Sequence, residues 1–241
     1  MARSPYEAAL GDGLDRLHPR LRPYFAAVPA GSVGRGRGTF AVVGTPRRWL
    51  WPVLWVLGRQ GVLFAVDRRD VPFRVENRPA TAASGEVAVT AVRTFAFADG
   101  TRRMVDEIAA RGDGLEDHLG HRRRWSARLR ATVVDGALTM VSTSTALRLG
   151  PVRLGLPRAV APRVTLHESY DESVGRQRVS VVLDSPALGR LYEYTGHFDY
   201  EVVADDPAPA DGPTAPAAPI GSTGPAGDDH PDRPHRRGPR P

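Results

Sequence analysis

Hydrophobic and polar residues alternate with a period of two along most of the chain from Val62 onward. This alternation is typical of β-strands that bury one face. It predicts strands over residues 71–77, 86–97, 102–109, 115–119, 125–134, 137–149, 163–170, 177–185 and 189–203. The dipeptides Asp99-Gly100 and Asp135-Gly136 lie between alternating arms and predict tight hairpin turns, so neighbouring strands are expected to be antiparallel.

The N-terminal part of the chain has helical spacing instead. An apolar stripe predicts a helix over residues 6–25, and the Gly and Pro residues within it leave two short helices as an alternative. The stripe consists of Leu10, Leu14, Leu17 and Leu21. Residues 30–38 are interpreted as a Gly/Arg loop and residues 39–43 as a short strand. A second helix is expected from Thr45-Pro46 to about residue 57.

These elements predict an α+β domain over residues 1–203. Its main feature is a curved, mostly antiparallel β-sheet of about eight to ten strands, with an N-terminal helix and a Trp-bearing helix packed on it. Residues 204–241 are rich in Pro, Ala, Gly and Asp and have almost no large apolar side chain. Such a segment cannot bury enough surface to offset its ordering entropy, which predicts a disordered C-terminal tail.

Composition excludes several chemistries. The chain has no Cys, which excludes disulfides, thiolate metal sites and cysteine nucleophiles. Every basic residue is Arg, so Schiff-base catalysis by lysine and the P-loop lysine are also absent. The formal net charge of +6 is interpreted as a solvated basic surface, with a specific polyanion site as the alternative. We expect no cofactor and no specific nucleic-acid partner.

Two short motifs resemble functional sites without their required context. The Gly34-Arg-Gly-Arg-Gly run lacks the preceding strand and following helix of a dinucleotide fingerprint. Asp117, His118 and His121 have a spacing that suits a metal only on a helix, whereas Gly120 favours a turn. We therefore predict no metal site.

The cytoplasm is the expected location. No secretory pattern is visible at the N-terminus. The most apolar run, residues 49–57, is too short to span a bilayer.

Aromatic residues share one face of the last predicted strand. Alternation places Tyr192, Tyr194 and Phe198 on this face. Core packing is the simplest interpretation, and an aromatic-lined pocket for an apolar ligand is the alternative. A bent antiparallel sheet closed by a helix could leave such a pocket.

Two pairs of adjacent ionisable residues each place one member inside. Asp106 and Glu107 face opposite sides of one strand, and so do His167 and Glu168. An inward carboxylate must be paired or protonated, and Arg93 is the partner expected for Asp106. An enzyme that uses inward acid/base residues such as Asp106 or His167 is therefore a second hypothesis.

The Trp-bearing segment has two interpretations. Trp51 and Trp55 are four residues apart and can share a helical face, whereas Trp49 must point elsewhere. Packing against the sheet explains most of this pattern. The alternatives are a lid over a cavity and a membrane-interface patch, because flanking arginines suit anionic headgroups.

Several motifs together are similar to a known family. They include Asp70-Val-Pro-Phe-Arg-Val-Glu-Asn, Pro162-Arg-Val-Thr-Leu-His-Glu-Ser-Tyr and Pro186-Ala-Leu-Gly-Arg-Leu-Tyr-Glu-Tyr-Thr-Gly-His-Phe. In order and spread, over roughly residues 4–200, they resemble the uncharacterised bacterial domain-of-unknown-function family 4166. The resemblance implies a soluble domain that occurs alone or joined to a saccharopine-dehydrogenase-like reductase, so a reductase is an implied partner. It brings no established activity and no catalytic residues.

The leading hypothesis is a domain that binds a hydrophobic or amphipathic small molecule in the concavity of the sheet. Its candidate ligand-binding residues are Trp51, Trp55, Arg93, Asp106, His167, Tyr192, Tyr194 and Phe198. The alternatives are an enzyme or reductase-accessory domain, and a peripheral protein with weak contact to anionic membranes. No catalytic residue is assigned.

Overall fold

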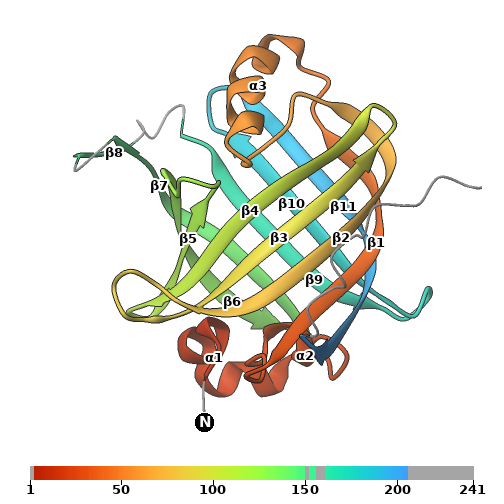
Figure 1. Cartoon of the computed structure of the whole chain (residues 1–241), viewed down its shortest axis with the longest axis vertical. Helices are drawn as coiled ribbons and strands as arrows, with labels where there is room; N and C mark the ends of the chain where they lie inside the picture. Colours follow the sequence, from red (N-terminus) through yellow and green to blue (C-terminus); the bar gives the residue numbers. More distant parts are fainter. Residues whose placement is uncertain (1–2, 150–151, 156–160, 206–241) are drawn as a thin grey trace, which may run out of the picture. The chain divides into compact units, whose positions relative to one another are not determined.

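Ten antiparallel strands close into a barrel in the computed structural model, which describes residues 3–149, 152–155 and 161–205 (Figure 1). Around the barrel the order is β6-β5-β4-β3-β2-β1-β11-β10-β9-β7, and β7 pairs again with β6. The strands are β1 (Ser32–Gly44), β2 (Asp67–Thr81), β3 (Val87–Phe97), β4 (Gly100–Arg111), β5 (Gly114–Leu119), β6 (Trp125–Val134), β7 (Ala137–Leu149), β9 (Arg163–Asp171), β10 (Arg176–Ser185) and β11 (Gly189–Ala204). A short strand, β8 (Val152–Gly155), pairs with β7 outside the ring. From residue 206 on, the predicted tail lies outside the described residues.

The prediction of a mostly antiparallel sheet is confirmed. The prediction that this sheet is curved but not closed is wrong, because it forms a barrel. The closing contact joins the first and last strands of the domain, from Ser32 opposite Ala204 to Gly44 opposite Glu193. Closure satisfies the hydrogen-bonding groups that a free sheet edge would expose. Alternation in a sequence has the same period in open and closed sheets, so it could not distinguish them.

Residues 30–38 are mostly strand rather than the predicted loop. The inward positions of β1 include Gly34, Gly36 and Gly38; Gly36 lies opposite Tyr200 and Gly38 opposite Phe198 of β11. A Cβ atom on Gly34 would overlap the Tyr200 hydroxyl, and one on Gly38 would overlap the backbone of β11. The glycines therefore leave room for aromatic rings inside the barrel, a pairing that short-range sequence rules do not detect.

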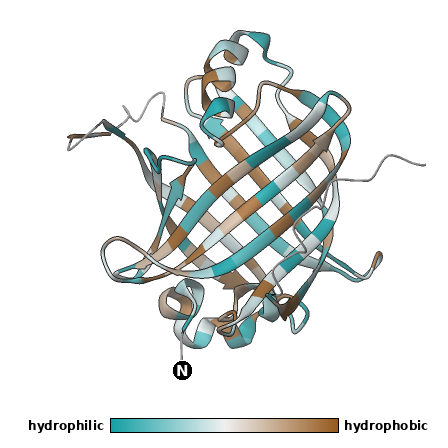
Figure 2. Cartoon of the chain, in the orientation of Figure 1, coloured by the Kyte–Doolittle hydropathy of each residue, from teal (hydrophilic) through white to brown (hydrophobic). Residues whose placement is uncertain are grey.

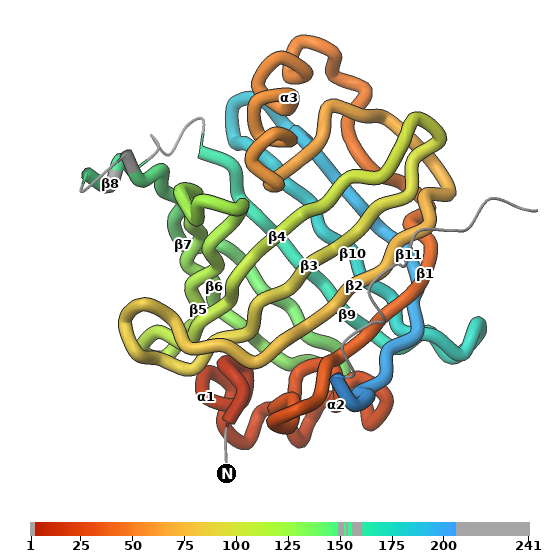
Figure 3. The backbone as a smooth tube through the Cα atoms, in the orientation of Figure 1, coloured from red at the N-terminus to blue at the C-terminus, as the bar shows by residue number. Residues whose placement is uncertain are grey.

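Small helices cover the ends of the barrel. The predicted packing of the helices on the face of the sheet is therefore wrong. The predicted helix over residues 6–25 is divided into α1 (Pro5–Leu10), the 3-10 helix η1 (Gly11–Arg16) and α2 (Arg22–Phe25). All three lie at one end, and α3 (Trp51–Arg59), preceded by the 3-10 helix η2 (Arg48–Leu50), lies at the other (Figure 1; Figure 3). Leu21 and Phe25 are completely buried there, which closes the end that holds α1 and α2.

Aromatic rings fill one side of the interior. Hydrophobic and hydrophilic residues alternate along the barrel strands, as Figure 2 shows. The Phe40 and Phe73 rings stack with centroids 3.8 Å apart, and Phe95 lies 5.3 Å from Phe40. The predicted core packing of the β11 aromatic face is confirmed, because Tyr192, Tyr194 and Phe198 all belong to the buried core.

Candidate functional site

A belt of polar side chains crosses the inward faces of β3, β4 and β5. Asp106 lies opposite Ala91, and Asp117 lies opposite Ile108, so Arg93, Asp106 and Asp117 are diagonal neighbours. Arg93 Nη1 donates to Asp106 Oδ1 in an ion pair whose side chains are 14% and 3% exposed. The predicted pairing of Arg93 with Asp106 is confirmed.

Three buried polar atoms beside this pair have no hydrogen-bond partner among the described residues. They are Asp117 Oδ1, Trp125 Nε1 and Thr145 Oγ1. Asp117 and Thr145 both lie opposite Ala127, whose small side chain separates them on the inner wall. Buried polar groups almost always have a partner, so these atoms mark a place where a bound molecule or water would complete the bonding.

The opposite wall carries a second polar pair. On β9 and β10, Gln177 Nε2 donates to Glu168 Oε2, and both residues are buried. The Tyr6 ring of α1 and the Tyr24 ring of α2 reach this region, where the charges of Glu168, Asp106 and Arg93 act on both hydroxyls. Neither hydroxyl has a hydrogen-bond partner in the described part of the chain.

Burial favours uncharged carboxyls in this interior. Desolvation raises the pKa of Asp117 well above its usual value, and the nearby Asp106 carboxylate raises it further. Desolvation also raises the pKa of Glu168 to about 7, although the Gln177 hydrogen bond opposes the shift. The interior therefore holds one compensated ion pair beside two carboxyls that resist ionisation.

The two ends of the barrel differ in how deeply their inward side chains are buried. The inward side chains there are only partly buried: Leu119, Trp125, Leu147, Val164 and Leu166. At the end covered by α1 and α2, inward residues such as Leu138 and Val133 are buried. The Val105 and His121 backbone N–H groups donate to the Gly61 and Gln60 carbonyls, which fixes the segment after α3 at this end of the barrel. At the end that carries α3, the less buried side is therefore the one formed by β5, β6, β7 and β9.

The structure brings together Arg93, Asp106 and Tyr194 of the predicted site. Phe198 also faces inward, where it packs on Phe73 with ring centroids 5.8 Å apart. Tyr192 faces inward too and is fully buried.

The other predicted site residues lie elsewhere. His167 is on the outer face, where its Nδ1 lies 3.0 Å from Thr139 Oγ1. Trp51 is partly buried and its Nε1 donates to the Thr45 carbonyl, whereas Trp55 is 58% exposed. These positions remove His167 and Trp55 from the interior.

Sequence reasoning missed Asp117, Glu168 and the two tyrosines of the N-terminal helices. The signal for Asp117 was present, because it alternates with Leu115 and Leu119 and so shares their inward face. His118 consequently points outward, and the group considered for metal binding is divided between two faces. Tyr6 and Tyr24 had no such signal, since only tertiary packing carries α1 and α2 to the strands.

Comparisons with known proteins give a family without an activity. The family model described as "Domain of unknown function (DUF4166)" matches residues 17–198. A similar protein, "Uncharacterized protein YndH" of Bacillus subtilis (strain 168), is 26% identical over 190 residues, covering 77% of this chain and 91% of the relative. Neither the family description nor the name of this relative states a function.

Proposed function

Because the chain belongs to the DUF4166 family, which has no assigned activity, we propose a function from the barrel itself: it binds a small amphipathic molecule with an uncharged polar end. The observation that carries this proposal is the group of three buried atoms, on Asp117, Trp125 and Thr145, that have no hydrogen-bond partner in the part of the chain that the structure describes. They lie on β5, β6 and β7, whose inward side chains are only partly buried at the end that carries α3. Unpaired buried polar atoms reduce stability, and a ligand that pairs with them recovers this loss on binding.

The two parts of the ligand fit different parts of the interior. Leu119, Leu147 and Val164 are the partly buried inward side chains at the α3 end, and they suit an apolar chain or ring. Deeper in, Asp117 and Thr145 offer hydrogen bonds to a hydroxyl or carbonyl group. The ligand would enter past α3 with its polar end first.

The charge of the interior selects against acids. Arg93 is already compensated by Asp106, so it offers no free positive charge. An ionised ligand would lie near Asp117 and Glu168, whose own ionisation is opposed by burial. The same argument weakens the enzyme hypothesis, since Asp106 is held in a pair and His167 lies outside.

A matched pair of ligands tests this proposal. Dodecanol should displace an environment-sensitive fluorophore from the protein at neutral pH more effectively than dodecanoate does. The T145V substitution should weaken the binding of dodecanol by about threefold to tenfold, the effect of losing one hydrogen bond. T101V is the control, because Thr101 is exposed on the outer face of β4. If neither compound displaces the probe, and native mass spectrometry shows the purified protein without a bound molecule, the proposal is wrong.

A second candidate function is contact with anionic membranes through the α3 end. Four large apolar side chains are exposed close together there: Trp49 at 55%, Val53 at 57%, Trp55 at 58% and Val56 at 48%. Arg48 lies over the Trp51 ring and Arg59 over the Trp55 ring, which places positive charge beside the apolar surface. Among the described residues, no helix has the length and apolarity needed to cross a bilayer.

Vesicle binding tests the membrane candidate. W55S should reduce co-sedimentation with anionic vesicles by about tenfold, because a buried aromatic side chain contributes more than 1.4 kcal/mol. V134S is the control: Val134 is 64% exposed at the end of β6, next to the turn whose Gly136 carbonyl accepts a hydrogen bond from the His18 N–H, between η1 and α2. Equal binding by wild type and W55S would exclude this surface as the membrane contact.

A further inference from the structure

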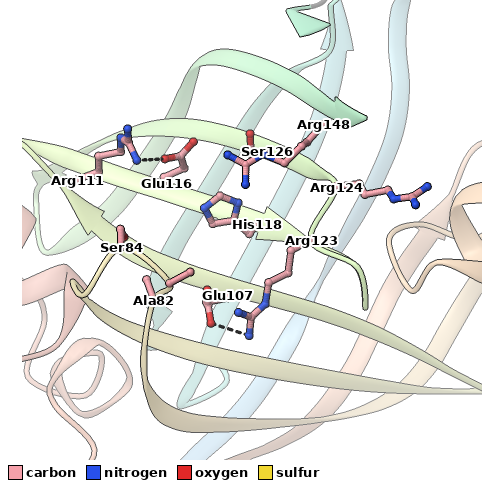
Figure 4. Close-up of a pocket in the computed structure, with 11 residues that line it drawn as sticks. Ala82, Ser84, Glu107, Arg111, Glu116, His118, Arg123, Arg124, Ser126 and Arg148 are labelled. Carbon is pink, nitrogen blue, oxygen red and sulfur yellow. Dashed lines mark ion pairs between the residues drawn. The ribbon is translucent and has the colours of Figure 1, made fainter. Parts of the chain in front are cut away.

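A separate cavity of about 350 Å³ lies on the outer face of the barrel, over β4, β5, β6 and β7 (Figure 4). The turn at residues 82–84, between β2 and β3, forms one of its walls. Its charged and ionisable lining includes Glu107, Arg111, Glu116, His118, Arg123 and Arg148. The sheet separates it from the interior site, because Asp117 and His118 are adjacent and point to opposite faces.

Both glutamates of this cavity are buried and paired. Arg123 Nη2 lies 2.7 Å from Glu107 Oε2, and Arg111 Nη1 lies 3.0 Å from Glu116 Oε2. The side chains of Glu107 and Glu116 are each 4% exposed, which is unusual for carboxylates that point away from a barrel interior. Their negative charges are therefore compensated within the cavity wall.

Arg148 differs from these arginines, because in the described part of the chain its guanidinium has no carboxylate partner. Figure 4 shows the Arg148 side chain directed toward the space between Glu116 and His118, whereas Arg124 points away from it. Burial lowers the pKa of His118, and the positive charge of Arg148 contributes to the lowering. Arg148 and His118 line the same cavity, so one ligand can contact both side chains.

We propose that this cavity binds the oxyanion of a small molecule, a phosphoryl or carboxylate group. The Arg148 guanidinium supplies the charge and a planar pair of donors that matches two oxygens. The neutral His118 ring supplies one further N–H donor. The cavity has the size of known small-molecule sites, which begin at about 300 Å³. The proposal is independent of the ligand in the barrel interior.

NMR of the His118 ring tests the proposal directly. Inorganic phosphate and acetate are titrated separately into the full chain, and the H118N variant assigns the ring resonance. We expect a saturable shift of the His118 resonance and a higher His118 titration midpoint when the anion is bound. R148Q should weaken binding by at least about tenfold, the loss expected for one charge-assisted hydrogen bond.

The control is R130Q, because Arg130 is an exposed residue on the outer face of β6 that lines a different depression. R130Q should retain the shift that R148Q loses. The anion with the lower dissociation constant identifies which oxyanion the cavity prefers. An absent shift with both anions, or an equal loss in R130Q and R148Q, overturns the proposal, since the second result would reflect only general charge screening.

Discussion

Replacing Arg93 with Met is expected to lower the free energy of unfolding by about 3–5 kcal/mol, the largest effect of any single substitution considered for this protein. Arg93 and Asp106 form an ion pair inside the barrel with the carboxylate 3% exposed. Removing the guanidinium leaves Asp106 buried without a compensating charge. Urea denaturation of the purified variant measures the loss.

The double variant R93M/D106L distinguishes the net contribution of the ion pair to the free energy of unfolding from the cost of leaving one charge buried without its partner. It should recover most of the stability lost in R93M, because two apolar side chains of similar volume remove both buried charges. R190M is the surface control: the exposed Arg190–Glu193 pair, 2.8 Å apart, should contribute about 0–1 kcal/mol. A double variant as unstable as R93M would mean that the pair stabilises the barrel for another reason.

Stability is expected to fall as the pH rises from about 4.5 to about 7, because of Glu168. Burial raises the folded-state pKa of this carboxyl from 4.5 to about 7. Across this window the folded protein keeps a proton that the unfolded chain has released, so higher pH favours unfolding. The stabilisation is complete below about pH 4.5 and is lost by about pH 7, with a total on the order of 3 kcal/mol.

The E168Q variant isolates this effect from other titrating groups. A neutral amide can still accept the Gln177 hydrogen bond, so the variant should be more stable than wild type above pH 7 and lose the Glu168 component of the pH dependence. The difference between the two unfolding curves measured at several pH values removes the contribution of Asp117, whose pKa shifts in the same direction. Parallel curves would contradict the assignment to Glu168.

Alternation predicted the strands and hairpins well because it records local burial. The last hairpin, β10 and β11, breaks at Ser185 and resumes at Gly189, as the Ser-Pro and Leu-Gly residues indicate. At the Asp135-Gly136 turn both residues have positive φ, of 50° and 76°, which a tight hairpin requires. The same local reasoning assigned Asp106 to the inside and Arg93 as its partner, because the two strands are consecutive.

The interior site required information that no local pattern contains. Glu168 and Gln177 face Arg93 across the barrel only because the sheet closes through β1 and β11, from opposite ends of the domain. Likewise, period-two alternation gives the face of Trp125 but not whether a partner stands opposite it, and the bulge between Ser142 and Ser144 in β7 shifts Thr145 to the inner face. The exposure of Trp55 also depends on where α3 lies at the barrel end.

Sequence patterns were sufficient to predict an antiparallel β domain, the inward face of most strands and the buried pair of Arg93 with Asp106. Only the folded chain shows that the sheet is closed, that Glu168 and not His167 lies inside, and that Asp117 Oδ1 has no hydrogen-bond partner among the described residues. Strand formation and the face on which a side chain lies depend on residues that are neighbours along the chain. Barrel closure and unmet hydrogen bonds depend on residues far apart in sequence that meet across the interior.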